Sequence, residues 1–291
     1  MKTTKMLREM LNSGEPFLTA GANDALSAVI AERAGFKAVT MGGYLATAVT
    51  MARPDIGLMS MMEMVTQLRH ICAATNIPVI GDADNGHGNV LNVIRTVQEM
   101  ENAGAAGIVL EDQVMPKRCG HMAGKKVIPM EEHVQKIRAA VYAREDPDFI
   151  IIGRTDAGQA HGIEDAIARG KAYAEAGADV VFVEAQENIE ELERVPKEIH
   201  GVPLVVNMIE GGRTPLLSKD ELGKMGYQVI FYNLGSLYSQ AKAIQNYCEY
   251  VIAHGTSAGF TGPMVTFDEF NSIVGLPELR ELEDKFKVHM N

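Results

Sequence analysis

The sequence predicts an α/β fold of the TIM-barrel, or (β/α)8, type. Eight short and nearly continuous apolar runs, typical of buried parallel strands, alternate with amphipathic helical segments over about 250 residues. No low-complexity linker interrupts the series, so residues 1–291 are expected to form a single domain. A doubly wound sheet is the alternative, but no G-x-G-x-x-G motif follows the first expected strand.

The expected strands and helices alternate regularly along the chain. Strands are expected at 17–20, 38–42, 78–82, 107–111, 149–154, 180–184, 204–207 and 229–233. Helices are expected at 2–11, 25–34, 61–74, 90–103, 131–144, 163–176 and 237–253. A glycine that ends a helix and precedes an apolar strand recurs at Gly35, Gly104 and Gly177, which indicates a repeated helix-strand unit.

The segment that follows the eighth expected strand and its helix is also apolar. Residues 262–291 include Phe267, Phe270 and Ile273, which is too apolar for a free tail. We therefore predict a helical tail that packs against the barrel or against a neighbouring subunit.

Composition and charge exclude several classes of protein. The 291 residues are 46% hydrophobic and carry a net charge of -11 without any Lys- or Arg-rich run, so nucleic acid is not the expected partner. No apolar signal region opens the chain and no long apolar window follows, so we expect a cytoplasmic protein without membrane insertion. Cys72, Cys119 and Cys248 lack C-x-x-C spacing and fit neither a disulfide framework nor a zinc site. Cys72 and Cys248 are expected in core packing.

Polar residues follow seven of the eight expected strands. In a barrel, the C-terminal ends of the strands meet at one face, and active sites form there. The polar or glycine positions at these ends are Gly42, Gly43, Tyr44, Asp82, Asp84, Glu111, Asp112, Arg154, Asp156, Glu184, Asn207, Glu210 and Asn233. Any one of them could be a turn former or helix cap, and Asp156 is a candidate for a cap. Their concentration at strand ends predicts a functional site.

Asp82 and Asp84 stand one residue apart at the exit of the third strand. Two carboxylates this close repel each other unless a cation neutralises them. With Glu111 on the next strand and no His or Cys partner, the oxygen ligands indicate Mg2+, with Mn2+ as the alternative.

Arg154 ends the apolar run of the fifth strand. A guanidinium at such a position costs free energy unless an anion pairs with it. That anion could be Glu184 or a substrate carboxylate.

A loop after the fourth strand contains Cys119. Lys117, Arg118 and His121 lie within two residues of it, and neighbouring positive charge favours the thiolate, so Cys119 is a candidate for proton transfer. Gly120 and Gly124 would let the loop move like a lid. The alternative is a solvated basic loop with an incidental cysteine.

Together these residues predict carbon-carbon bond chemistry next to a carboxylate. A 2-hydroxy or 2-keto acid would suit a hard divalent metal, which stabilises developing alkoxide or enolate charge.

Several short motifs resemble those of a known family. They are R-P-D-I-G at 53–57, D-A-D at 82–84, V-L-E-D-Q at 109–113, K-R-C-G-H at 117–121, R-T-D-A at 154–157, and Asn207 with T-P-L at 214–216. On these motifs the chain resembles the isocitrate lyase and phosphoenolpyruvate mutase superfamily over nearly its whole length. The cysteine of the K-R-C-G-H loop is similar to that of the lyase branch.

The resemblance implies a Mg2+-dependent homotetramer that exchanges helices between subunits. Its substrate would be a small 2-hydroxy acid, cleaved to a 2-keto acid and a carboxylate carbanion that Cys119 protonates. By similarity, Asp82, Asp84 and Glu111 surround the metal. Residues predicted to bind substrate are Gly42, Gly43, Tyr44, Gly120, His121, Arg154, Glu184 and Asn207, with Asp55 and Lys117 in supporting positions.

Within the lyase branch, cleavage of 2,3-dimethylmalate to pyruvate and propionate is favoured. The alternative is 2-methylisocitrate, whose lyases typically have Ser-Gly-Gly-Gly after the second strand, where this chain has Gly42-Gly43-Tyr44-Leu45. A Thr and an Arg of those lyases correspond to Ile209 and Tyr238 in this chain. Without that Arg, a buried substrate carboxylate would lack its cation, which costs several kcal/mol. A phosphonate-forming mutase is the alternative of another class. The family's base for the hydroxyl is a Tyr where this chain has Thr40, and Tyr44 is a possible substitute.

Overall fold

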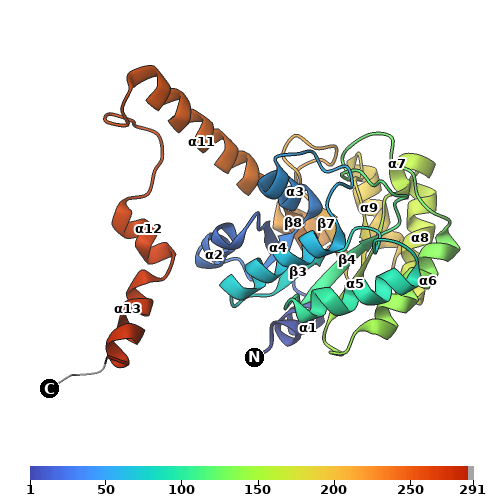
Figure 1. Ribbon diagram of the computed structural model, residues 1–291. Coiled ribbons are helices and arrows are strands. Elements are labelled where there is room, and N and C mark those ends of the chain that lie inside the picture. Colours follow the sequence, from blue (N-terminus) through green and yellow to red (C-terminus); the bar gives the residue numbers. More distant parts are fainter. Residues whose placement is uncertain (288–291) are drawn as a thin grey trace. The chain divides into compact units, whose positions relative to one another are not determined.

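The protein contains a closed eight-stranded parallel barrel. This computed structural model describes residues 1–287. The strands pair in chain order, β1 to β8, and β8 closes on β1. Helices surround the strands (Figure 1). The prediction of a TIM barrel is confirmed.

The strand boundaries agree with the expected ones to within one or two residues. The strands are β1 Phe17–Gly21, β2 Ala38–Met41, β3 Val79–Asp82, β4 Gly107–Glu111, β5 Ile150–Thr155, β6 Val180–Val183, β7 Leu204–Asn207 and β8 Val229–Tyr232. The helices are α1 Thr3–Asn12, α2 Ala25–Arg33, α3 Gly43–Met51, α4 Met61–Ala74, α5 Val90–Asn102, α6 Met130–Ala143, α7 Ala157–His161, α8 Ile163–Glu175, α9 Ile189–Glu198, α10 Lys219–Met225, α11 Gly235–His254, α12 Phe267–Ile273 and α13 Leu276–Lys285.

The segment after β2 is a helix rather than a loop. Gly42 is the N-cap of α3, and Gly43 and Tyr44 form its first turn. The backbone N–H of Gly43 has no partner within the helix and donates to Asp82 Oδ2 at 2.8 Å. A carboxylate on the neighbouring strand therefore satisfies this helix start.

The inside of the barrel is filled by apolar side chains. Phe182 of β6 and Phe231 of β8 meet edge to face, with ring centroids 5.7 Å apart. Leu7 and Leu11 of α1 belong to the same buried cluster as these strands. The Gln228 side-chain amide donates to the carbonyls of Met10 and Leu11 at the end of α1. Helix α1 thus seals the N-terminal end of the barrel.

The chain divides into two compact units, residues 1–236 and 237–291. The first contains the barrel, and the second contains most of α11 together with α12 and α13. The expectation of one domain over 1–291 stays a prediction. Cys248 is exposed, so its predicted place in core packing is wrong, whereas Cys72 is half-buried. No helix within residues 1–287 has the length and apolar character needed to cross a membrane.

A buried hydrogen-bond network fixes the end of β5. Asp112 is fully buried, and its Oδ2 accepts from Thr155 Oγ1 at 2.7 Å, from the Tyr173 hydroxyl at 2.7 Å and from Arg169 Nη1 at 3.1 Å. Its Oδ1 accepts from the backbone N–H of Asp156 at 2.9 Å. One carboxylate therefore joins the β4 exit, the β5 exit and helix α8.

Asp112→Ala is expected to lower the free energy of unfolding by about 3–5 kcal/mol, because it leaves the buried Arg169 without one of its two carboxylate partners. Tyr173→Phe removes one hydrogen bond from the same carboxylate and should cost about 1 kcal/mol. Urea denaturation of both variants measures the difference. A cost for Asp112→Ala no larger than that of Tyr173→Phe would contradict this role for Asp112.

Candidate active site

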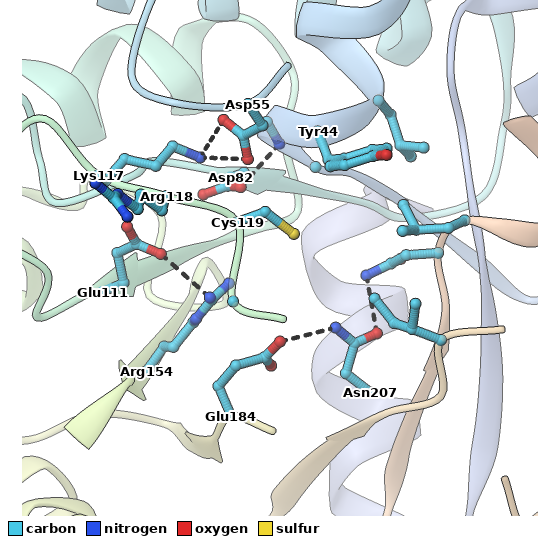
Figure 2. A pocket seen from close by; sticks show the side chains of 17 residues that line it. Tyr44, Asp55, Asp82, Glu111, Lys117, Arg118, Cys119, Arg154, Glu184 and Asn207 are labelled. Atoms are coloured by element: carbon cyan, nitrogen blue, oxygen red, sulfur yellow. Dashed lines mark hydrogen bonds and ion pairs between the residues drawn. The ribbon is translucent and has the colours of Figure 1, made fainter. Parts of the chain in front are cut away.

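A pocket with a volume of about 50 Å³ lies where the C-terminal ends of the strands meet (Figure 2). Its lining residues are Gly42, Gly43, Tyr44, Leu45, Asp55, Asp82, Glu111, Lys117, Arg118, Cys119, Gly120, Arg154, Glu184, Asn207, Ile209, Asn233 and Leu234. Among the predicted site residues, Asp84 and His121 do not line it, but Asp84 contacts Lys117 and His121 contacts Glu184, which both do. Such a volume holds only a few water molecules.

A flap, residues 114–126, closes one side of the pocket. A bridge between Gln113 and Val127 joins the two ends of the flap. The Gln113 side chain donates to the carbonyl of Arg118 and accepts from its N–H, both at 2.9 Å. Gly124 has φ +78°, which favours glycine. The flap is therefore held at its base and at Arg118.

Lys117 of the flap reaches into the acidic end of the pocket. Its Nζ lies 2.8 Å from both Asp55 oxygens and 2.7 Å from Asp84 Oδ1. Burial alone would lower the pKa of Lys117, but Asp84, Asp82 and Asp55 raise it well above its ordinary value. The ammonium therefore stays charged and neutralises part of the acidic cluster.

Asp82 and Glu111 are the other two acidic side chains at this end of the pocket. Asp82 accepts from the N–H groups of Gly43 and Asp84, and the charges of Lys117 and Arg154 hold its pKa below the ordinary value in spite of burial. Burial raises the pKa of Glu111 well above its ordinary value, although Arg154 opposes this. Glu111 Oε1 is buried without a hydrogen-bond partner.

The donor set at this end fits a hard divalent cation. Carboxylate oxygens are the ligands that Mg2+ prefers, and a cation would supply the partner that Glu111 Oε1 lacks. Across residues 1–287, no three His, Cys, Asp or Glu side chains converge tightly enough to bind one ion directly. Mg2+ usually keeps several waters and takes one or two carboxylates, so Asp82 and Glu111 suffice for such a site. The metal roles of Asp82, Glu111 and Asp84 all stay predictions, and Asp84 pairs with Lys117.

Arg154 is held by Asp156 in a two-pronged ion pair. Arg154 Nε donates to Asp156 Oδ2 at 2.9 Å, and Nη2 donates to Asp156 Oδ1 at 3.0 Å. Burial would raise the pKa of Asp156, but Arg154 and Lys125 hold it well below its ordinary value. The candidate role of Asp156 as a side-chain helix cap is wrong, because its side chain makes no capping bond. The guanidinium lies over the Phe182 ring and 3.4 Å from Glu111.

The thiol of Cys119 points into the pocket (Figure 2). Burial raises its pKa to about 11, and the carboxylates of Asp55 and Glu184 add to this. The prediction that basic neighbours favour the thiolate is wrong. The Lys117 ammonium pairs with acids, and the Arg118 guanidinium donates to the Ala123 carbonyl. Neither positive charge is therefore placed to stabilise a thiolate at Cys119. The group is therefore a protonated thiol near neutral pH.

Glu184 and Asn207 complete the wall opposite the acidic cluster, and His121 contacts Glu184. Glu184 Oε1 lies 3.3 Å from both His121 Nε2 and Asn207 Nδ2. Gly120 packs tightly beside them, since a Cβ there would come within 2.5 Å of Glu184 Oε1 and Arg154 Nη2. Only a glycine lets the flap approach this closely.

Leu45, Ile209 and Leu234 form the apolar part of the pocket beside Asn233. From the sequence, Leu45 and Ile209 stand out only as departures from the 2-methylisocitrate lyase pattern, and Leu234 was not predicted. Each lies one to two residues beyond a polar or glycine position at a strand end, and this position along the chain is the signal that could have predicted it. Thr40 lies deeper in the barrel and bonds with the Asn233 side chain.

Comparisons with known proteins agree with this geometry. A family model described as phosphoenolpyruvate phosphomutase matches residues 7–252. The chain is 47% identical over 286 residues to 2,3-dimethylmalate lyase of Eubacterium barkeri, covering 98% of this chain and 99% of that one. It is 38% identical over 270 residues to 2-methylisocitrate lyase of Aeropyrum pernix, covering 93% and 86%.

Solved structures share the fold over nearly the whole chain. A crystal structure of a 2,3-dimethylmalate lyase, described as a PEP mutase/isocitrate lyase superfamily member, superposes with a TM-score of 0.92 at 34% identity, covering 98% of this chain and 95% of that one. A phosphonopyruvate hydrolase in complex with oxalate and Mg2+ gives 0.89 at 30% identity, covering 98% and 99%. With a matching family model and two such relatives, the chain belongs to the phosphoenolpyruvate mutase/isocitrate lyase superfamily.

Proposed function

We propose that the protein is a Mg2+-dependent carbon-carbon lyase that cleaves 2,3-dimethylmalate to pyruvate and propionate. The observation that carries the proposal is a protonated thiol on a flap that faces a pocket with a guanidinium at one side and acidic oxygens at the other. The 47% identity to 2,3-dimethylmalate lyase supports the choice of substrate.

Arg154 would bind the carboxylate of the pyruvate half. Its guanidinium is oriented by Asp156 and lines the pocket, which suits planar recognition of a carboxylate. The start of α3 lines the same pocket at Gly42 and Gly43, but the Gly43 N–H already donates to Asp82, so the guanidinium is the group assigned to the carboxylate. Transfer of the 2-hydroxyl proton to a base, for which Tyr44 in the pocket lining is the candidate, lets the C2–C3 bond break, and C2 becomes the keto carbon of pyruvate.

Cys119 would then donate its proton to C3. The electron pair of the broken bond stays on C3 as a carbanion next to the second carboxylate, and transfer of the thiol proton to it yields propionate. A thiol whose pKa is raised by burial is protonated before this step, as a general acid must be.

Asp82 and Glu111 are the residues that would hold Mg2+, and Asp84 would support them through its ion pair with Lys117. The bound cation would stabilise the negative charge that develops on the 2-oxygen. A solved relative at 30% identity binds oxalate and Mg2+, which supports the choice of cofactor.

The apolar wall favours the smaller leaving group. Leu45, Ile209 and Leu234 would contact the methyl side of propionate. Succinate, released from 2-methylisocitrate, has one more carboxylate and needs a further cation. The nearby cations Lys117 and Arg154 already pair with Asp55 and Asp156.

The substrate is tested by a pyruvate assay coupled to NADH oxidation by lactate dehydrogenase. With Mg2+ present, kcat/KM for 2,3-dimethylmalate should exceed that for 2-methylisocitrate by about tenfold or more, because a buried carboxylate without a cation is costly. Chelation by EDTA should abolish both rates and Mg2+ should restore them. The reverse ranking would favour a 2-methylisocitrate lyase. Phosphonate formation from phosphoenolpyruvate, detected by phosphorus NMR, would favour a mutase instead.

Cys119→Ser is expected to lower kcat by about 10²–10⁴-fold, because a serine hydroxyl is a much weaker acid than a thiol. Pyruvate binding, measured by calorimetry in the presence of Mg2+, should change little. Cys72→Ser, in helix α4 and outside the pocket, is the matched control and should keep wild-type kcat. Turnover by Cys119→Ser at the wild-type rate would remove the thiol from the chemistry.

The second unit supports a proposed homotetramer. Its helices α11, α12 and α13 contain no buried residues, and Phe267 and Phe286 are 82% and 73% exposed. So many exposed aromatic and aliphatic side chains in one segment are typical of an association surface. The tail 262–291 would be covered by another copy of the chain.

The full chain should therefore have the mass of four subunits in sedimentation equilibrium. A chain ending at residue 261 should have a lower mass, because it lacks α12 and α13. As a control, Tyr142→Ser changes an exposed aromatic side chain on the barrel and should keep the tetramer. A truncated chain that still forms tetramers would contradict the role of the tail.

A further inference from the structure

Lys125 is a buried cation at the far end of the flap that the proposed chemistry does not use. Its side chain is fully buried, although it does not line the pocket. Its Nζ donates to the carbonyl of Gly120 and to Asp156 Oδ1, the latter at 2.8 Å. The ammonium therefore joins two parts of the flap to the carboxylate that holds Arg154.

Asp156 is shared between a partner in the barrel and a partner in the flap. Arg154 comes from β5 in the barrel wall, whereas Lys125 belongs to the flap. Both donate to Asp156 Oδ1, and Arg154 also donates to Oδ2. If the flap opens, Asp156 loses one of these two cations, and its ion pair with Arg154 keeps only the two hydrogen bonds from the guanidinium.

The flap backbone also packs directly on the guanidinium. A Cβ on Gly120 would lie 2.5 Å from Arg154 Nη2, and the Gly120 carbonyl is the group that Lys125 binds. Lys125 thus binds both Gly120, the flap residue next to Arg154, and Asp156, the acid that orients Arg154.

We propose that Lys125 is a latch that holds the flap closed and at the same time fixes the orientation of Arg154 for a substrate carboxylate. Substrate entry requires the flap to open, because the closed pocket of about 50 Å³ is too small for a six-carbon dicarboxylate. Closure brings Lys125 onto Asp156 and Gly120 and orders the guanidinium around the bound anion. Lys125 is a positioning residue. The link to a substrate carboxylate rests on the proposed function, whereas the link to flap closure does not.

The first test measures flap opening through the Cys119 thiol. Alkylation by iodoacetamide, followed by peptide mass spectrometry, should be about tenfold faster or more in Lys125→Met than in the wild type, because a buried charged hydrogen bond is lost. Cys72, half-buried in helix α4, reports general loosening and should react at the wild-type rate. Lys125→Arg keeps the charge and should restore most of the protection. Lys126→Met, an exposed neighbour, is the matched control and should behave as the wild type.

The second test measures the binding of pyruvate by calorimetry with Mg2+ present. Lys125→Met should bind pyruvate about tenfold more weakly, and Lys125→Arg should recover affinity. Unchanged Cys119 alkylation in Lys125→Met would overturn the latch, and so would an equal rise at Cys72, since the residue would then serve only general stability. Faster Cys119 alkylation with unchanged pyruvate affinity would overturn the link to Arg154. A wild-type protein that fails to cleave 2,3-dimethylmalate would refute the proposed function and leave the alkylation result standing.

Discussion

The site depends on the pairing of buried charges around a small pocket. Asp55, Asp84 and Asp156 pair with the guanidinium of Arg154 and the ammonium groups of Lys117 and Lys125, and isolated charges at this depth would each cost several kcal/mol. The ion pairs differ in what they connect. Asp156 pairs with Arg154 inside the barrel, whereas Lys117 and Lys125 pair with acids outside the flap and so hold the flap in place. Any movement of the flap therefore also changes the charge balance of the pocket.

Most of the fold could be predicted from the sequence, because parallel strands buried on both faces leave continuous apolar runs and closure of the barrel brings their C-terminal ends together. The same geometry explains why polar residues on separate strands, such as Asp82, Glu111 and Arg154, could be assigned to one pocket. The start of α3 was missed because Gly42 and Gly43 indicate a loop locally, and the acceptor for the Gly43 N–H lies on another strand.

The protonation state of Cys119 could not be read from its neighbours in sequence. Residues adjacent in a loop point in different directions, and the cations beside Cys119 bind Asp55, Asp84 and a backbone carbonyl. Burial then dominates and raises the pKa of the thiol. Asp156 was misjudged for a similar reason. Its place before a short helix is typical of a cap, but its oxygens bind Arg154, two residues earlier on β5, and Lys125 of the flap.

The seal that α1 forms at the N-terminal end turns the pocket into a dead end. Leu7 and Leu11 fill the other mouth with hydrocarbon, so the substrate and the products of the proposed reaction would all pass through the same opening. Each turnover would then need the flap to open at least twice, once for loading and once for release. With the flap closed, the proposed carbanion would take its proton from a group already inside the pocket.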